Sequence, residues 1–287
     1  MKKLKILITG VAGFIGSHIA DMFIKEGHIC HGIDNLVTGN IENVNPKCKF
    51  MKDDFKHSGY YFAKHKKGYF DLVVHCAAQV DVRFSIEHPK EDCENNVLKT
   101  VELLNDMIEF GVKKIIFLST GGALYDFYDE NPKSEFDILK PLSPYAVSKL
   151  ACEHYIKYYS KQHGLEHCIL RLANVYGPRN EHGVISLFRK QIEDGNEICV
   201  NGGDQVRDFI HVSDVVSAVK KAVDLRGTFN VSTGIETKII DLAHTMAKKS
   251  KAKIVKKPYV KGEAMYSCMH SMLLRGHGWA PENKLTP

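Results

Sequence analysis

The sequence predicts an α/β protein: a doubly wound parallel sheet with helices on both faces, followed by a smaller C-terminal lobe. Three observations support this fold class. Short, wholly apolar runs alternate with segments of helical periodicity, turn residues separate them, and the alternation loosens after about residue 175. Strands that are apolar throughout are typical of a parallel sheet whose two faces are both covered by helices.

The predicted elements follow one another in a regular order. Strands are expected at residues 5–9, 28–33, 72–76, 114–119, 167–172 and 228–231, and helices at residues 15–26, 95–110, 145–163 and 212–223. Turn signals then cluster at residues 177–180, 195–196 and 202–204. We therefore expect one domain from residues 1–173 together with about 208–232, and a second lobe from residues 174–207 and 233–287.

Composition and charge are those of an ordinary globular protein, with 44% hydrophobic residues, 25% charged residues and a net charge of +5. The one dense basic group, between Lys248 and Lys257, has no interleaved aromatic residues. It could be a nucleic-acid or membrane patch, but we favour a solvated lysine face. No nucleic-acid partner is therefore expected.

The distribution of cysteine and apolar residues favours a cytoplasmic protein. The eight cysteines are spread singly without a C-x-x-C pair, which predicts free thiols in a reducing compartment and no metal site. No run approaches eighteen uninterrupted apolar residues, so no membrane span is expected. Glycines and polar residues interrupt the apolar stretch near the start, which therefore does not match a signal peptide.

A glycine-rich turn directly follows the first predicted strand. Gly10, Gly13 and Gly16 allow a tight turn, close approach of the backbone to a phosphate, and helix N–H groups that face a pyrophosphate. Asp34 ends the second strand, eighteen residues beyond Gly16, where a carboxylate can bind ribose hydroxyls and would repel a 2′-phosphate. Ordinary turns also collect such residues, but the order of strand, turn, helix and strand favours a Rossmann-type unit that binds NAD.

Tyr145 and Lys149 lie four residues apart on one face of a predicted helix. A free tyrosine, with a pKa of about 10, is a poor base near pH 7. A neighbouring lysine cation and a positive nicotinamide ring would favour the phenolate and lower that pKa. The pair could also be a chance surface pair, but it follows the cofactor unit and a strand that ends in Thr120.

In this order the motifs resemble those of the extended short-chain dehydrogenase/reductases, specifically the NAD-dependent nucleotide-sugar epimerase/dehydratase family, and most closely its 4-epimerases. The match runs from residue 4 to about residue 235. Besides the glycine turn and the Tyr145–Lys149 pair, it rests on segments 34–39, 53–55, 75–79, 96–97, 118–125, 171–178 and 203–212. The resemblance implies that the first domain binds NAD and that the lobe binds a sugar nucleotide.

The resemblance also implies which residues form the site. Cofactor contacts are expected from Gly10, Gly13, Phe14, Ile15, Gly16, Asp34, Asn35, Thr38, Gly39, Asp54, Phe55, Ala77, Ala78, Gln79, Asn96, Tyr145 and Lys149. Substrate contacts are expected from Thr120, Gly121, Gly122, Tyr145, Asn174, Arg207 and Glu263.

Each reacting residue has an implied role. Tyr145 would act as base and then as acid, Lys149 would tune it and hold the nicotinamide ribose, and Thr120 would hydrogen-bond the sugar 4-oxygen. Asn174 and Arg207 would hold the substrate diphosphate. The alternatives are that Thr120 caps a strand end, and that Arg207 forms an ion pair with Asp204 or Asp208.

The residues after Thr120 favour one reaction of the family. Related dehydratases carry an acid pair at this point, whereas this chain has Gly121 and Gly122. The resemblance then implies 4-epimerisation of a UDP-sugar, UDP-glucose or UDP-galactose, with NAD regenerated in each turnover. A 4,6-dehydratase, a decarboxylase and a non-catalytic NAD-binding relative remain as alternatives.

The C-terminal part departs from the family pattern. An arginine expected two residues before Gly262-Glu263 is missing, and Lys261 or Lys257 would have to replace it. His270 stands where relatives have an aspartate. Ser267 is small at a position that is bulky in enzymes restricted to UDP-glucose and UDP-galactose, which implies room for N-acetyl sugars.

By resemblance, the protein is expected to be a homodimer. The helices at 95–110 and 145–163 would pack with those of a second copy as a four-helix bundle. The first of these helices carries Val97, Val101, Leu104 and Ile108, although burial against its own sheet would explain these residues equally well.

Overall fold

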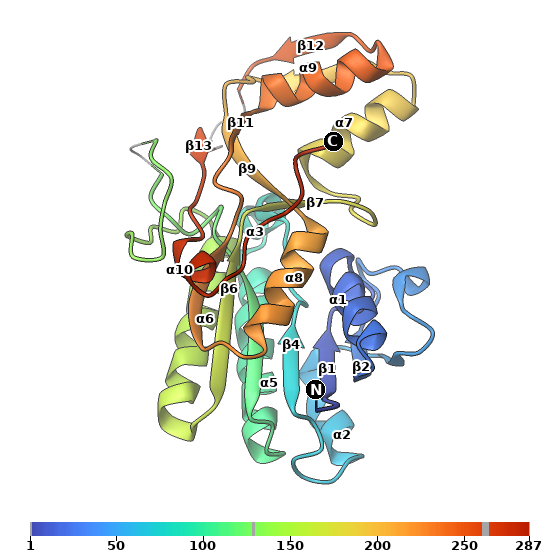
Figure 1. The fold of residues 1–287 in the computed structure, drawn as a ribbon, viewed down its shortest axis with the longest axis vertical. Helices are drawn as coiled ribbons and strands as arrows, with labels where there is room; N and C mark the ends of the chain where they lie inside the picture. Colours follow the sequence, from blue (N-terminus) through green and yellow to red (C-terminus); the bar gives the residue numbers. More distant parts are fainter. Residues whose placement is uncertain (1, 128–129, 260–263, 287) are drawn as a thin grey trace.

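A seven-stranded parallel sheet forms the centre of the computed structural model, which describes residues 2–127, 130–259 and 264–286 (Figure 1). The strands run in the order β10-β6-β5-β4-β1-β2-β3. Their bounds are β1 (Lys5–Thr9), β2 (Ile29–Asp34), β3 (Lys49–Lys52), β4 (Leu72–His75), β5 (Lys114–Thr120), β6 (Glu166–Leu172) and β10 (Gly227–Val231). The predicted doubly wound sheet is confirmed.

Helices cover both faces of this sheet (Figure 1). One face packs on α1 (Phe14–Lys25) and α8 (Val212–Ala222), and the other packs on α2 (Ser58–Ala63), α5 (Lys99–Glu109) and α6 (Pro144–His163). Alternate residues of β1 point to opposite faces of the sheet. Ile6 and Ile8 belong to the core beneath α1 and α8, and Leu7 belongs to the core beneath α2, α5 and α6. This two-sided burial explains why the strands are apolar throughout.

Strand β3 at the edge of the sheet was not predicted. Its sequence is Lys-Phe-Met-Lys, and only Phe50 and Met51 are partly buried. The two terminal lysines are exposed, so the segment contains no apolar run that would distinguish it from a loop.

The helix predicted at residues 95–110 is longer and interrupted. Helix α4 (Pro89–Cys93) leads into a π-helical turn, η3 (Glu94–Leu98), which continues into α5. Within this turn the carbonyl of Asn96 accepts hydrogen bonds from the Thr100 hydroxyl, at 2.6 Å, and from the Cys152 thiol, at 3.2 Å. Such π turns occur often at functional sites.

A smaller lobe with its own core lies beyond the sheet (Figure 1). Its strands are β7 (Asn174–Tyr176), β8 (Ile198–Asn201), β9 (Val206–His211), β11 (Glu236–Lys238), β12 (Ile254–Lys257) and β13 (Tyr266–Ser267). Helices α7 (Gly183–Glu193) and α9 (Ile239–Ser250) pack on them, and α3 (Val82–Glu87), η1 (Ile41–Asn43), η2 (Phe55–His57) and α10 (Met272–Gly276) complete the described elements. The domain boundaries given above remain a prediction.

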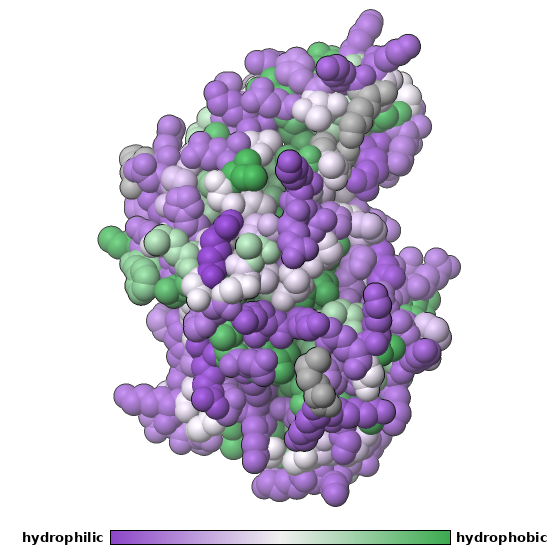
Figure 2. All heavy atoms as spheres, viewed as in Figure 1, coloured by the Kyte–Doolittle hydropathy of each residue, from purple (hydrophilic) through white to green (hydrophobic). Residues whose placement is uncertain are grey.

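The surface in Figure 2 is mostly hydrophilic. A small group of hydrophobic residues stands at its left edge, over the loop between β5 and α6, where Phe136 and Ile138 are exposed. Across the described ranges, no helix is long and apolar enough to cross a membrane, and no group of three or more potential ligands is placed to hold a metal ion. All eight cysteines are free thiols.

Candidate functional site

The glycine turn between β1 and α1 is fixed by backbone contacts. Gly10 has φ +70°, and a Cβ atom there would lie 2.8 Å from the nitrogen of Ala77. A Cβ atom on Gly16 would lie 2.1 Å from the Gly10 oxygen, so both positions require glycine. Gly13 precedes α1 and offers no side-chain cap, which leaves the first N–H groups of the helix for another acceptor. This donor set suits a pyrophosphate.

Asp34 ties the glycine turn to the end of β2. Its Oδ2 accepts the N–H of Ala12 and its Oδ1 accepts the N–H of Leu36, each at 2.9 Å. The carboxylate is buried beside Gly39, where a Cβ atom would lie 2.8 Å from Oδ1. Two backbone donors leave capacity for further hydrogen bonds, which fits the predicted ribose contact. Nearby, Asn35 and Thr38 are exposed.

Asp54 and Phe55 begin the short helix η2. The Asp54 carboxylate accepts hydrogen bonds from the Lys56 N–H, at 3.1 Å, and from Lys99 Nζ, at 2.6 Å. Burial acts to raise the pKa of Asp54, but these bonds lower it overall. Phe55 is buried edge-on against the His75 ring. Asp54 is therefore held as an anion close to the predicted cofactor site.

A buried network links residues 75–79, named here the cofactor loop, to the helix that carries Tyr145. Gln79 and Asn96 bind each other twice, because Asn96 Oδ1 accepts the Gln79 N–H and Asn96 Nδ2 donates to the Gln79 carbonyl. Both side chains donate to Asp92 Oδ1, at 2.8 and 3.0 Å, and Ser148 Oγ donates to Asp92 Oδ2 at 2.6 Å. The sequence predicted Gln79 and Asn96 but not Asp92 or Ser148, which belong to no motif named above.

Tyr145, Lys149 and Thr120 meet where α6 begins beside the end of β5. Ser143 caps the start of the helix, and its Oγ accepts the Ala146 N–H at 3.2 Å. Thr120 ends β5 and lies close enough to Tyr145 for its hydroxyl to lower the pKa of the phenol. Lys149 is buried; its Nζ donates to the Leu118 carbonyl at 2.6 Å and lies 4.2 Å from the centre of the Phe117 ring.

The charges around Tyr145 act against its ionisation. Burial raises the pKa of the phenol and the nearby Asp92 raises it further, while the Thr120 hydroxyl beside it acts to lower it. Burial also lowers the pKa of Lys149. In the chain by itself the pKa of Tyr145 is thus raised, because desolvation and Asp92 outweigh the effect of Thr120. The predicted lowering, which included the charge of a nicotinamide ring, stays a prediction.

A buried ion pair supports this corner of the sheet. Arg171 on β6 donates to both oxygens of Glu153 on α6, at 3.0 and 2.7 Å, and Ser119 Oγ donates to Glu153 Oε1 at 2.7 Å. Arg171 also donates to the Tyr125 hydroxyl at 2.9 Å. These hydrogen bonds therefore fix the positions of β5, β6 and α6 relative to one another, next to Thr120.

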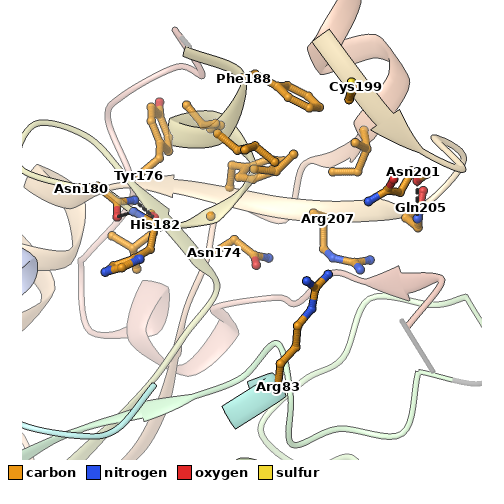
Figure 3. Close-up of a pocket in the computed structure, with 17 residues that line it drawn as sticks. Arg83, Asn174, Tyr176, Asn180, His182, Phe188, Cys199, Asn201, Gln205 and Arg207 are labelled. Atoms are coloured by element: carbon orange, nitrogen blue, oxygen red, sulfur yellow. Dashed lines mark hydrogen bonds between the residues drawn. The ribbon is translucent and has the colours of Figure 1, made fainter. Parts of the chain in front are cut away.

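A pocket of about 470 Å³ opens beside the strands of the lobe (Figure 3). Asn174 and Arg207, both predicted, line it, and Asn174 Nδ2 donates to the Asp208 carbonyl at 3.0 Å. Arg83 on α3 also lines it and was not predicted, because no motif singled it out. The Asp208 carboxylate accepts hydrogen bonds from Thr233 and Gly234, and Asp204 accepts one from Tyr259.

Ser267 lies next to the glycines that follow Thr120. Its Oγ donates to the Gly122 carbonyl at 3.4 Å, and it is paired opposite Arg207 between β13 and β9. A Cβ atom on Gly122 would lie 3.3 Å from Ser267 Oγ and 3.9 Å from Asn174 Nδ2. The loop that follows Thr120 and the pocket therefore meet at these residues.

The structure describes only some of the residues predicted to act in the C-terminal part. Glu263 and Lys261 lie outside the described residues. Lys257 is exposed on β12, paired opposite Asn201, which lines the pocket. His270 lies near Gly234, where a Cβ atom would be 3.2 Å from its Nδ1.

Comparisons with known proteins agree on one family. The pattern of the NAD dependent epimerase/dehydratase family matches residues 6–232. A protein of Methanocaldococcus jannaschii, provisionally named UDP-glucose 4-epimerase, is 39% identical over 96% of this chain and 93% of its own length.

Solved structures give the same result. The Thermotoga maritima UDP-glucose 4-epimerase with UDP-glucose has a TM-score of 0.92 at 35% identity, covering 98% of this chain and 94% of that one. A UDP-N-acetylglucosamine 4-epimerase from Methanobrevibacter ruminantium, in complex with UDP-N-acetylmuramic acid, has a TM-score of 0.91 at 30% identity, covering 98% and 94%.

Proposed function

Because the chain belongs to the NAD-dependent epimerase/dehydratase family, whose cofactor is NAD, we propose that it is a 4-epimerase of UDP-sugars that interconverts UDP-glucose and UDP-galactose. One observation supports this choice above the others. Thr120 lies beside Tyr145 at the end of β5 and lowers the pKa of its phenol, and the residues that follow, 121–125, include no acid that could remove water from the sugar.

The proposed reaction uses the residues already described. NAD, held by the glycine turn and Asp34, would supply the hydride acceptor for sugar C4 and the hydride that would return to the opposite face of the ring. Tyr145 takes the proton of the 4-hydroxyl and gives it back in the second half of the reaction. Thr120 hydrogen-bonds the same oxygen, Lys149 contributes positive charge, and Asn174 and Arg207 bind the diphosphate. The cofactor is unchanged at the end of a turnover.

The fit to NAD rests on the donor set. The glycine turn, the uncapped start of α1 and the buried Asp34 would hold the pyrophosphate and the adenosine ribose. Tyr145 needs positive charge nearby to ionise, since its own surroundings raise its pKa. An oxidised nicotinamide ring would supply such a charge.

The test is to incubate the pure protein with UDP-galactose and to measure UDP-glucose. We expect Tyr145→Phe to lower the rate by at least about 100-fold, because a positioned acid–base group contributes about 10² to 10⁴ in rate. Tyr60→Phe, at an exposed tyrosine on α2, serves as the control and should keep the activity. NAD content, measured in each variant, separates loss of chemistry from loss of cofactor.

Two results would contradict the proposal. Product that forms undiminished in Tyr145→Phe would reject the mechanism. A 4-keto product that has lost water would identify a dehydratase instead.

The size of the sugar site is part of the proposal. Ser267 is buried beside Gly122, so a small residue stands at the junction of the catalytic loop and the pocket. We infer that UDP-GlcNAc and UDP-GalNAc are accepted as well. Failure of both acetylated sugars in the same assay, with good turnover of UDP-galactose, would exclude this extension.

We also propose that the protein is a homodimer that pairs its α5 and α6 helices with those of a second copy. Val97 and Leu104 are buried in the chain's own core and cannot contribute to such an interface. Exposed apolar side chains instead follow one stripe of α6, Val147, Tyr155 and Tyr158, with Leu98 nearby in the helix that leads into α5. Exposed apolar groups of this kind mark contact surfaces.

A further inference from the structure

Asp92 is a buried carboxylate at the point where three elements meet. It lies on α4 and is 0% exposed. Its Oδ1 accepts hydrogen bonds from Gln79 in the cofactor loop and from Asn96 in η3, and its Oδ2 accepts one from Ser148 on α6. One side chain therefore ties both the cofactor loop and the π-helical turn to the helix that carries Tyr145.

Backbone groups fix the orientation of the two amides that face Asp92. Gln79 Oε1 accepts the N–H of Asp81, and Asn96 Oδ1 accepts the N–H of Gln79. Each amide therefore turns its nitrogen atom toward Asp92, so Oδ1 has to accept both hydrogen bonds. An ionised carboxylate meets this requirement, because both of its oxygens are acceptors.

The surroundings of Asp92 leave its negative charge without a direct counter-ion. Its three hydrogen-bond donors, from Gln79, Asn96 and Ser148, are all neutral. No residue in the described ranges forms an ion pair with Asp92. Tyr145 stands one helical turn before Ser148, and its phenol is one of the groups on which this charge acts.

Few other groups act on the ionisation of Tyr145. Helix α6 packs against α3, α4, η3, α5, β5 and β6. The groups that act on the phenol are Asp92 from α4, Thr120 from β5 and Cys152 from α6 itself. Burial raises the pKa of Cys152, so this thiol is uncharged near pH 7. Asp92 is therefore the charged member of this set.

The groups around Lys149 do not replace Asp92 in this role. They are the thiols of Cys76 and Cys152 and the carboxylates of Glu153 and Asp92. Burial raises the pKa of Cys76 to about 12, so this thiol is also uncharged near pH 7. Glu153 is paired with Arg171.

We propose that Asp92 is a positioning residue with two effects: its hydrogen bonds hold the cofactor loop against α6, and its negative charge keeps Tyr145 protonated while no cation lies beside the phenol. This inference rests on the proposed function, in which Tyr145 is the base. Because Asp92 is 0% exposed, it acts through these neighbours and not by contact with the sugar.

Two variants separate the charge of Asp92 from its hydrogen bonds. Asp92→Asn has the same shape; its oxygen can accept from both amides and its nitrogen can donate to Ser148, so the bonds are kept while the charge is removed. Ser148→Ala keeps the charge and removes the bond to α6. Asp194→Asn removes a carboxylate that is exposed at the end of α7 in the lobe, and it is the control.

The first measurement is an ultraviolet titration of tyrosinate in the NAD-loaded protein without sugar, with Tyr145→Phe as the reference. We expect Asp92→Asn to lower the midpoint for Tyr145 by about one pH unit, because a like charge nearby disfavours the ionised phenol. The pH at which kcat/KM for UDP-galactose is half-maximal should fall by the same amount. Ser148→Ala and Asp194→Asn should keep the midpoint of the unchanged protein.

The second measurement is the rate at which NAD leaves the loaded protein. We expect Ser148→Ala to raise this rate by about 10-fold, because the cofactor loop loses a hydrogen bond between its charged anchor and α6. Asp92→Asn should change the rate by less than about threefold, since it keeps the connection. The control Asp194→Asn should not change it.

Each effect can be overturned by its own result. A midpoint that is unchanged in Asp92→Asn would overturn the effect of the charge, and NAD release that is unchanged in Ser148→Ala would overturn the effect of the hydrogen bonds. If the titrations of the unchanged protein and Tyr145→Phe coincide, the phenol does not ionise beside NAD, and the effect of the charge is again overturned.

The outcome is separable from that of the proposed function, because neither the titration nor the release of NAD uses a sugar. A protein that epimerises no sugar but shows both effects keeps the role of Asp92 toward Tyr145 and loses the proposed activity. A protein that epimerises UDP-galactose while neither measurement responds to the variants keeps the activity and loses this inference.

Discussion

The His75 ring lies between two hydroxyl groups in the core of the sheet. Its Nδ1 is 2.7 Å from Thr9 Oγ1, and its Nε2 is 3.0 Å from Thr100 Oγ1. Burial, with a smaller effect of Lys149, lowers the pKa of His75 to about 3. The ring is therefore neutral near pH 7, and it positions the start of the cofactor-flanking turn rather than transferring protons.

This lowered pKa predicts a loss of stability in acid. Between about pH 6.5 and pH 3 the unfolded chain binds a proton at His75 that the folded chain does not, so the free energy of unfolding falls as the pH falls. At pH 5 the loss from this group is about 2 kcal/mol. Urea unfolding at pH 7.5 and pH 5 should show a smaller acid-induced drop in His75→Gln than in the unchanged protein.

His154→Gln is the matched control, since His154 is exposed on α6. It should show the same drop as the unchanged protein. An equal drop in His75→Gln would mean that the ring takes up its proton in the folded state. Burial also lowers the pKa of His31, to about 4. His31 contributes the same acid-induced loss of stability in the unchanged protein and in both variants.

The residues that could be predicted from the sequence are those that lie in ordered local motifs. Tyr145, Thr120 and Asn174 stand in recognisable segments, and the structure places Tyr145 against Thr120. Asp92 was missed because its partner, Ser148, lies on another element far along the chain. Arg83 was missed because Arg207, which lines the same pocket, is equally distant in the sequence. A single polar residue carries no local pattern that reveals such a partner.

At the scale of elements, the Glu153–Arg171 pair connects α6 with β6 away from solvent. The side chains are 0% and 3% exposed, so neither charge can be hydrated if the other is removed. We expect Glu153→Met to lower the free energy of unfolding by about 3 to 5 kcal/mol, because Arg171 is left buried and unpaired. Chemical denaturation measures this loss.

Two further variants show whether the cause is the unpaired charge. Glu153→Met combined with Arg171→Met should be less destabilised than Glu153→Met alone, because no buried charge remains. Glu26→Gln removes the exposed pair with Lys220 and should change stability by less than about 1 kcal/mol. If the double variant is at least as destabilised as Glu153→Met alone, the two side chains stabilise the protein through their packing and not through their charges.

Elements of the large sheet were easier to predict than those of the lobe. Strands such as β1 and β5 are apolar runs buried on both faces, so each is visible by itself. Strand β13 has only two residues, and β9 contains Arg207, Asp208 and His211. These lobe strands form through pairing with distant segments, and their own sequences give little indication of it.

At the scale of the whole molecule, the exposed stripe on α6 predicts the oligomeric state. We expect sedimentation analysis to give twice the chain mass of 32.4 kDa for the unchanged protein. Tyr158→Glu should shift it to the monomer, because a charge would have to be buried in the apolar interface. Tyr60→Glu, at an exposed tyrosine on α2, is the control and should remain dimeric. An unchanged protein that sediments at the chain mass would contradict the proposed dimer.

The π-helical turn η3 contains one residue more than an α-helix would use over the same length. Deleting one residue between Asn96 and α5 would close the turn and rotate Asn96 by about 100° about the helix axis, away from Gln79. The regular helix would form a better hydrogen-bond ladder, while the cofactor loop would lose its anchor. The deletion should therefore raise the thermal stability and lower the retention of NAD. The additional residue is a local defect in the helix on which the cofactor site depends.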